Sequence, residues 1–70
     1  MEESILIKFG KRVREFRTER NLTQHQLADI SGLHKNYIGM VERGERNPSL
    51  VNIDVLAKSF EISISELLNF

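Results

Sequence analysis

The chain has 70 residues, of which 40% are hydrophobic and 29% charged, and its formal net charge is zero. A chain about half as long as an average domain leaves no room for a separate catalytic partner, so we expect a single domain over residues 1–70. The absence of Cys excludes disulfides and zinc–thiolate sites, and the longest apolar run is too short to span a membrane. We therefore expect a cytoplasmic protein that does not bind a membrane.

Charge is distributed unevenly along the chain, although its sum is zero. Residues 5–20 carry six basic and two acidic side chains, whereas residues 48–70 carry one basic and three acidic ones. A basic segment of this kind can bind phosphates, but it is equally typical of the solvated face of an ordinary helix. The charge pattern alone leaves both interpretations open.

Periodicity and capping predict the first two helices. Apolar side chains recur at spacings of three and four, which predicts a helix over residues 4–20 that Gly10 weakens locally. Thr23 and Gln26 form a capping box, in which the Thr hydroxyl accepts from a free amide and the Gln side chain reaches back. The second helix is therefore predicted to begin directly after Thr23 and to end at Ser31–Gly32.

The third and fourth helices are predicted from their boundaries. The third covers residues 35–43 and stops at Gly44, because glycine readily takes the left-handed conformation of many helix C-termini. Pro48 and Ser49 open the fourth. Apolar side chains recur along it at helical spacing.

A short fifth helix completes the predicted fold. Ser63 and Glu66 form a second capping box, and the helix ends in Leu67 and Leu68. No segment alternates between apolar and polar residues over the length of a strand. The sequence therefore predicts a compact all-α fold of five helices.

The second and third helices are predicted to form a helix-turn-helix, because only three residues join them. Ala28 is the small residue expected where two steeply crossing helices touch, and Gly32 supplies the positive φ of the turn. Leu27, Leu33 and Ile38 are expected to point into the core that the two helices share.

The outward face of the third helix determines whether this unit can read DNA. Opposite Ile38 and Val41, that face carries Asn36, Gly39, Met40 and Arg43, with Lys35 at its leading edge. The four of these residues that suit base edges are Lys35, Asn36, Gly39 and Met40. In a major groove Lys can donate to guanine, Asn can pair with adenine, Met can touch a thymine methyl, and Gly allows close approach. We expect these four residues to contact bases. The alternative is that they form an ordinary solvent-facing surface.

A second group of residues is placed to contact phosphates, which set the register of a protein on DNA without reading its sequence. Gln24 begins a helix, where free amides and the helix dipole favour an anion. The others lie on or after the third helix and are Tyr37, Arg43, Arg46 and Asn47. The alternative for each of these residues is that it is an exposed polar group without a specific binding partner.

The same part of the chain carries a resemblance to a known family. It lies in the segments Thr23-Gln24, Leu27-Ala28, Ser31-Gly32-Leu33, Tyr37-Ile38, Val41-Glu42-Arg43-Gly44 and Asn47-Pro48-Ser49-Leu50. Together these resemble the XRE-like helix-turn-helix family of phage Cro and repressor proteins over about residues 9–68, and residues 34–47 are especially similar to restriction-modification controller proteins. The resemblance implies a lambda-repressor-like fold and a homodimer that binds a palindromic operator in double-stranded DNA and regulates transcription.

The resemblance also implies a role for two charges. In related repressors an Arg late in the first helix pairs with a Glu late in the third, and the matching residues here are Arg17 and Glu42. Such a pair would spare Glu42 the penalty of an unpaired buried carboxylate, while Arg17 also contacts a phosphate. The chain departs from the family at Glu61, where Gly usually ends the fourth helix.

A twofold dimer requires an apolar surface. One recognition helix buries too little area for a specific DNA site, and so small a domain cannot bury every apolar side chain near its C-terminus. We expect the dimer interface to be formed by Val51, Val55, Ile64, Leu68 and Phe70.

Other functions lack the residues that they require. His25 and His34 do not have the spacing of a metal site, and the chain has no nucleophile elbow, phosphate-binding Gly loop or dinucleotide fingerprint. We therefore expect neither an enzyme nor a bound metal or cofactor. The alternative function is a helix-turn-helix module that binds a protein, such as an antitoxin holding a toxin or an adaptor on RNA polymerase. The neutral net charge is compatible with that alternative.

Overall fold

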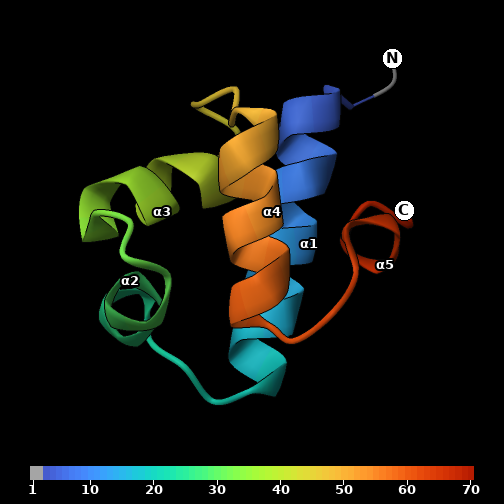
Figure 1. Cartoon of the computed structure of the whole chain (residues 1–70). Coiled ribbons are helices and arrows are strands. Elements are labelled where there is room, and N and C mark those ends of the chain that lie inside the picture. The colour runs from blue at the N-terminus through green and yellow to red at the C-terminus, as the bar shows by residue number, and fades with distance from the viewer. Residues whose placement is uncertain (1–2) are drawn as a thin grey trace.

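The computed structural model describes residues 3–70, which form five α-helices and no strand (Figure 1). The helices are α1 (Ile5–Glu19), α2 (Gln24–Ser31), α3 (Lys35–Glu42), α4 (Leu50–Ser59) and α5 (Ile64–Leu67). The prediction of an all-α fold is therefore confirmed, and the predicted helix boundaries lie close to the observed ones. Within residues 3–70, no helix combines the length and the apolar character that crossing a membrane requires.

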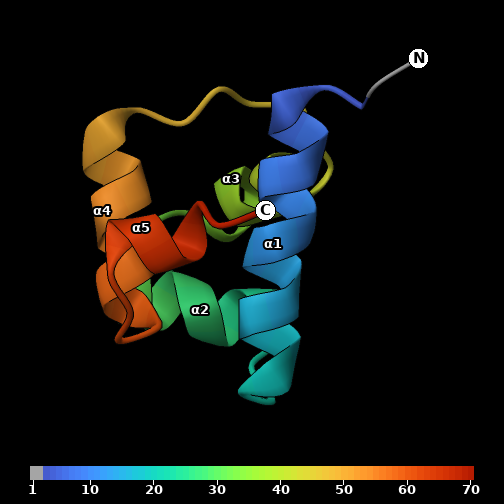
Figure 2. The same ribbon diagram turned by 90° about the vertical axis from the view of Figure 1, so that its right-hand side faces the viewer.

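The helices enclose one hydrophobic core. Helices α1 and α4 run roughly parallel, with α2 and α3 on one side of them and α5 on the other (Figure 1, Figure 2). The buried apolar side chains come from every helix and are Phe9, Val13, Phe16, Leu27, Ile38, Val41, Leu56, Ala57, Phe60 and Leu67. Because each large apolar side chain contributes about 1.5–3 kcal/mol when fully buried, this cluster supplies much of the driving force for folding.

Side chains cap the start of each helix. The predicted box at Thr23 is complete, because its hydroxyl accepts from the Gln26 amide at 3.0 Å and Gln26 Oε1 accepts from the Thr23 amide at 2.8 Å. Hydroxyl groups also accept from first-turn amides at α1, α4 and α5, where the capping residues are Ser4, Ser49 and Ser63. Each cap of this kind stabilises a helix by about 1 kcal/mol.

Among residues 3–70, positive φ angles occur at both predicted turn glycines and at two other residues. Gly32 and Gly44 have φ angles of 75° and 76°, as predicted. Asn21 and Glu61 have φ angles of 56° and 60°. Glu61 therefore adopts the left-handed conformation that favours Gly, at a cost of about 1–2 kcal/mol for an L-residue. The chain turns after α4 through this residue without a glycine.

The closest packing around α3 occurs where α1 crosses it. Gly10 is buried, and a Cβ atom built on it would lie 2.6 Å from the Glu42 carbonyl oxygen and closer still to that of Val41. Real Cβ atoms essentially never approach a backbone atom so closely. The residue that weakens α1 locally therefore allows the backbones of α1 and α3 to touch, which fixes the depth at which α3 sits.

Candidate nucleic-acid interface

Helix α3 is anchored by its inner face and exposed at its start. Ile38 and Val41 are buried in the core, whereas Lys35 and Asn36 are exposed. Met40, on the outward side, is half-buried. Together with α2, α3 lies at one edge of the molecule (Figure 1). The two polar residues expected to read bases are thus accessible at the first turn of α3.

Gly39 is not open to the surface, although helical periodicity places it on the outward face. It is buried, and a Cβ atom built on it would lie 3.1 Å from Arg43 Nη1 and 3.5 Å from Gln24 Oε1. Two flexible polar side chains therefore cover it. A DNA base can approach Gly39 only if these side chains move, which periodicity within α3 alone could not reveal.

The ion pair that the resemblance implied is formed at the junction of α1 and α3. Arg17 Nε lies 2.6 Å from Glu42 Oε2, and Arg17 Nη2 donates to Glu42 Oε1 at 3.0 Å. The side chains of Arg17 and Glu42 are only 11% and 4% exposed. Gln24 Nε2 also donates to Glu42 Oε1 at 3.1 Å, so that the pair ties α1, α2 and α3 together.

These bonds restrict what Arg17 and Gln24 can offer to a phosphate. Arg17 Nη1 also donates to the Leu22 carbonyl oxygen at 2.7 Å. Gln24 uses its side-chain amide on Glu42, although its backbone remains at the N-terminus of α2. Phosphate contacts by Arg17 therefore depend on its remaining guanidinium protons, and those by Gln24 on its backbone or on rearrangement of its side chain.

Tyr37 connects α3 to α4 and to the loop between them. Its hydroxyl oxygen accepts a hydrogen bond from Asn52 Nδ2 at 3.0 Å. The Arg46 guanidinium carbon lies 5.6 Å from the centre of the Tyr37 ring, within the range of a cation–π interaction. Sequence reasoning named Tyr37 and Arg46 but missed Asn52, because nothing in the spacing of the chain relates residues on separate helices.

Arg43 is exposed but already has a partner. Its Nε and Nη2 donate to the two carboxylate oxygens of Glu45 at 3.0 and 3.2 Å. The hydrogen bond from Arg43 and the charge of Glu45 both raise the pKa of the Arg43 guanidinium. A phosphate can therefore bind the Nη1 protons, which Glu45 does not use, or replace Glu45. Water and salt screen this exposed ion pair, so replacing Glu45 costs little.

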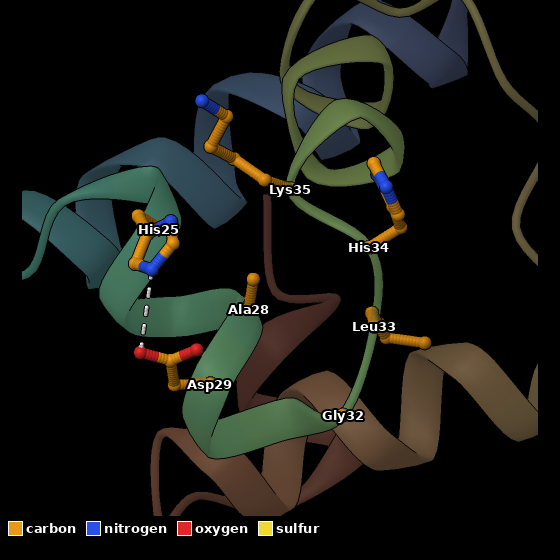
Figure 3. A pocket seen from close by; sticks show the side chains of 7 residues that line it. All are labelled: His25, Ala28, Asp29, Gly32, Leu33, His34 and Lys35. Carbon is orange, nitrogen blue, oxygen red and sulfur yellow. Dashed lines mark ion pairs between the residues drawn. The ribbon is translucent and has the colours of Figure 1, made fainter.

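The two histidines lie beside the corner between α2 and α3, where they help to line a shallow hollow (Figure 3). His34 caps α3, because its Nδ1 accepts from the Asn36 amide at 3.1 Å. His25 Nε2 lies 3.7 Å from Asp29 Oδ2 at the surface. Within residues 3–70, no group of three or more metal-binding side chains occurs.

Ala28 lines the same hollow. It is half-buried, and its methyl group faces the open space between α2 and the start of α3 (Figure 3). It also packs against the edge of the core. A close contact that excludes a larger side chain also occurs at Gly10, which the sequence predicted only as a weak point of its helix.

The residues expected at a dimer interface lie on different parts of the surface. Val51 is 70% exposed, while Val55 is half-buried beside Ile30 of α2. Leu68 and Phe70 instead line an apolar hollow of about 230 Å³, together with Ile5, Leu6, Phe9, Asn47, Pro48 and Ile53. Ile64 packs against the core. The molecule therefore exposes more than one apolar surface.

Comparison with known proteins identifies relatives of this arrangement. The helix-turn-helix family matches residues 13–67. The control protein C.SmaI of Serratia marcescens is 52% identical over 59 residues, which cover 84% of this chain and 70% of that protein. These matches agree with the expectation that the chain is not an enzyme.

Solved structures share the same fold. The restriction-modification controller protein C.AhdI of Aeromonas hydrophila superposes with a TM-score of 0.86 at 55% identity, covering 89% of this chain and 94% of that one. The biofilm regulator SinR, solved in complex with DNA, gives a TM-score of 0.81 at 28% identity over 86% of this chain and 97% of its own. From its five helices, its short turn after α2 and these matches, we conclude that the chain belongs to the XRE-like helix-turn-helix family, with restriction-modification controller proteins among its relatives.

Proposed function

We propose that this protein is a sequence-specific DNA-binding regulator of transcription, of the type found in restriction-modification controllers. The observation that carries the proposal is the arrangement of α3, whose inner face is buried while Lys35 and Asn36 are exposed at its first turn. The name of C.SmaI as a control protein and the DNA complex of SinR support it. Such a regulator would work in the cytoplasm, where it reaches its operator.

Base recognition is assigned to the outward side of α3. Lys35 would donate to guanine and Asn36 would pair with adenine, each from an exposed position in the first turn. Met40 would contact a thymine methyl with the exposed part of its side chain. Gly39 has no side chain, so it would let the backbone of α3 approach the DNA closely once the Gln24 and Arg43 side chains turn toward the DNA.

Phosphate binding is assigned to residues around the same helix. Tyr37 and Arg46 lie together, and Arg43 and Asn47 are exposed near them at the end of α3 and in the loop that follows. Gln24 and Arg17 would contribute from the N-terminus of α2 and the end of α1. Contacts of this kind fix the register of α3 in the groove without reading the sequence.

We further propose a homodimer, because two recognition helices about 34 Å apart match successive turns of B-DNA. The five residues named from the sequence remain the proposed interface, with Val51 at its centre because it is the most exposed of them. Contact with RNA polymerase belongs to the same proposal.

A salt titration tests the proposal. We expect the affinity for a nonspecific duplex, measured by fluorescence anisotropy, to fall steeply and linearly with the logarithm of salt concentration. A selected operator should bind more tightly than the nonspecific duplex. Lys35→Ala or Asn36→Ala should reduce this difference in affinity, while the phosphate contacts that remain should still support nonspecific binding. An affinity for duplex DNA that is absent or does not respond to salt would favour the protein-binding alternative.

A further inference from the structure

We propose that Asn52, a residue outside the recognition helix, positions the Tyr37 hydroxyl so that it donates its proton to a DNA phosphate. This inference rests on the proposed function, since it supposes that α3 lies on DNA. Tyr37 and Asn52 are the third residues of α3 and α4, and Asn52 Nδ2 donates to the Tyr37 hydroxyl oxygen at 3.0 Å. The first turns of the two helices are therefore joined by one hydrogen bond.

The direction of that bond determines what Tyr37 can do next. A phenolic hydroxyl has one proton to donate and can also accept. Because the oxygen accepts from Asn52, its proton must point away from the Asn52 amide. Within residues 3–70, that proton has no hydrogen-bond acceptor. Tyr37 is therefore left as a donor, and a phosphate oxygen, which only accepts, is the complementary group.

Asn52 is held firmly enough to impose this direction. Its backbone amide donates to the hydroxyl of Ser49, the cap of α4, at 3.1 Å. Its side chain is half-buried, as is that of Tyr37. Since both ends of the bond lie in capped first turns, the hydroxyl is oriented before any ligand arrives, and less rotational freedom is lost on binding.

Arg46 places a positive charge next to this donor. Its guanidinium carbon lies 5.6 Å from the centre of the Tyr37 ring, and the side chain is exposed. A hydroxyl proton and a cation side by side suit a phosphodiester, whose charge strengthens hydrogen bonds to its oxygens. Asn52 is thus a positioning residue that acts through Tyr37, while Tyr37 and Arg46 touch the ligand.

A double-mutant cycle tests this role. Tyr37→Phe should weaken binding to the operator and to a nonspecific duplex by about tenfold each, the scale of one charge-assisted hydrogen bond. Asn52→Ala should weaken both by about three- to tenfold. In the Tyr37→Phe background, Asn52→Ala should change either affinity by less than about twofold, because the hydroxyl that it orients is gone.

An acidic variant separates orientation from packing. In Asn52→Asp the new carboxylate can only accept a hydrogen bond. It should therefore take the Tyr37 hydroxyl proton, which would then point inward and away from the phosphate. An acidic residue in the first turn also favours a helix, so the melting temperature should hold or rise while DNA binding falls. Ser49→Asp is the matched control, because it adds the same charge to the same helix end and keeps a capping side chain.

The outcomes are distinct. Asn52→Asp should weaken binding about tenfold more than Ser49→Asp does, and this excess should vanish in the Tyr37→Phe background. Equal losses in the two acidic variants, or additive losses in the cycle, would overturn the role of Asn52. If Asn52→Ala does not fold, as judged by circular dichroism, the two acidic variants decide the question. A wild-type protein that fails to bind any duplex would instead overturn the proposed function itself.

Discussion

The Glu42 carboxylate accepts two hydrogen bonds from the Arg17 guanidinium, at 2.6 and 3.0 Å, in a part of the molecule where both side chains are almost fully buried. Arg17 belongs to α1 and Glu42 is the last residue of α3. Helix α3 is thus tied to the body of the protein by a charged pair at one end and by the core along its inner face.

Removing one partner of this pair should be costly. We expect Glu42→Ala to lower the free energy of unfolding by about 3–5 kcal/mol, because Arg17 is left buried without its counter-charge. Urea denaturation measures the loss. Glu45→Ala, which removes the acid of an exposed pair, should leave stability nearly unchanged. Replacing both partners, as Arg17→Met with Glu42→Leu, should recover most of the stability, and a double variant as unstable as Glu42→Ala would contradict this account.

Gly10 of α1 and Gly39 of α3 should respond differently to an added methyl group. Gly10→Ala places a Cβ against backbone carbonyls of α3 and should cost at least about 1–3 kcal/mol, because neither helix can move without disturbing the core. Gly39→Ala meets only the ends of flexible side chains and should be neutral or stabilising by up to about 1 kcal/mol, the gain in helix propensity. Thermal unfolding of the two variants compares them directly, and equal effects would argue against a backbone contact between α1 and α3.

Glu61→Gly should stabilise the protein. Glycine removes about 1–2 kcal/mol of left-handed backbone strain but loses roughly 0.5–1 kcal/mol in chain entropy, so we expect a net gain of up to about 1.5 kcal/mol. Asn21→Gly is a suitable control at a similar φ, and its gain should be smaller because Asn tolerates this conformation better. A drop in melting temperature for Glu61→Gly would show that the Glu61 side chain makes a compensating contribution.

The proposed dimer interface can be tested with a pair of neighbouring residues. Val51 and Leu50 are exposed to the same extent, and both lie in the first turn of α4, but they point about 100° apart. Val51→Asp should raise the dimer dissociation constant at least about a hundredfold, since the dimer would bury an unpaired charge. Leu50→Asp should leave it unchanged in sedimentation equilibrium. The reverse result would place the interface on another side of α4.

Arg46 should contribute to affinity without contributing to sequence preference. We expect Arg46→Ala to weaken binding to operator and nonspecific duplexes by the same factor and to reduce the salt slope by about one. Arg46→Lys should keep the slope but lose part of the affinity, because a lysine ammonium does not reproduce the contact of the guanidinium group with the Tyr37 ring. A change in operator preference on either substitution would move Arg46 into the base-reading group.

The sequence predicted the features that depend on neighbouring residues. Caps such as Thr23 and turn residues such as Gly32 act within a few positions of the chain, and their chemistry is the same in any protein. The helix boundaries therefore followed from the sequence. The family resemblance supplied the pair between α1 and α3, which local patterns could not have linked.

Contacts between distant segments could not be predicted in this way. Periodicity places Gly39 on an outward face, but only the structure shows Gln24 folded over it from another helix. Periodicity also gave no sign of the contacts of Gly10 and Asn52, because each contact involves a residue far away in the chain. Nor could it show that Leu68 and Phe70 line one hollow while Val55 lines another.

The backbone contact at Gly10 also bears on how such a protein can change its target during evolution. Because α1 holds α3 through main-chain atoms and buried apolar groups, the pose of α3 does not depend on the identity of Lys35 or Asn36. On the proposed function, substitutions at those two positions would alter what is recognised while the scaffold stays intact. The proposed base-reading residues are thus separate from those that hold α3 in place, which would let a lineage explore new operators without passing through unstable intermediates.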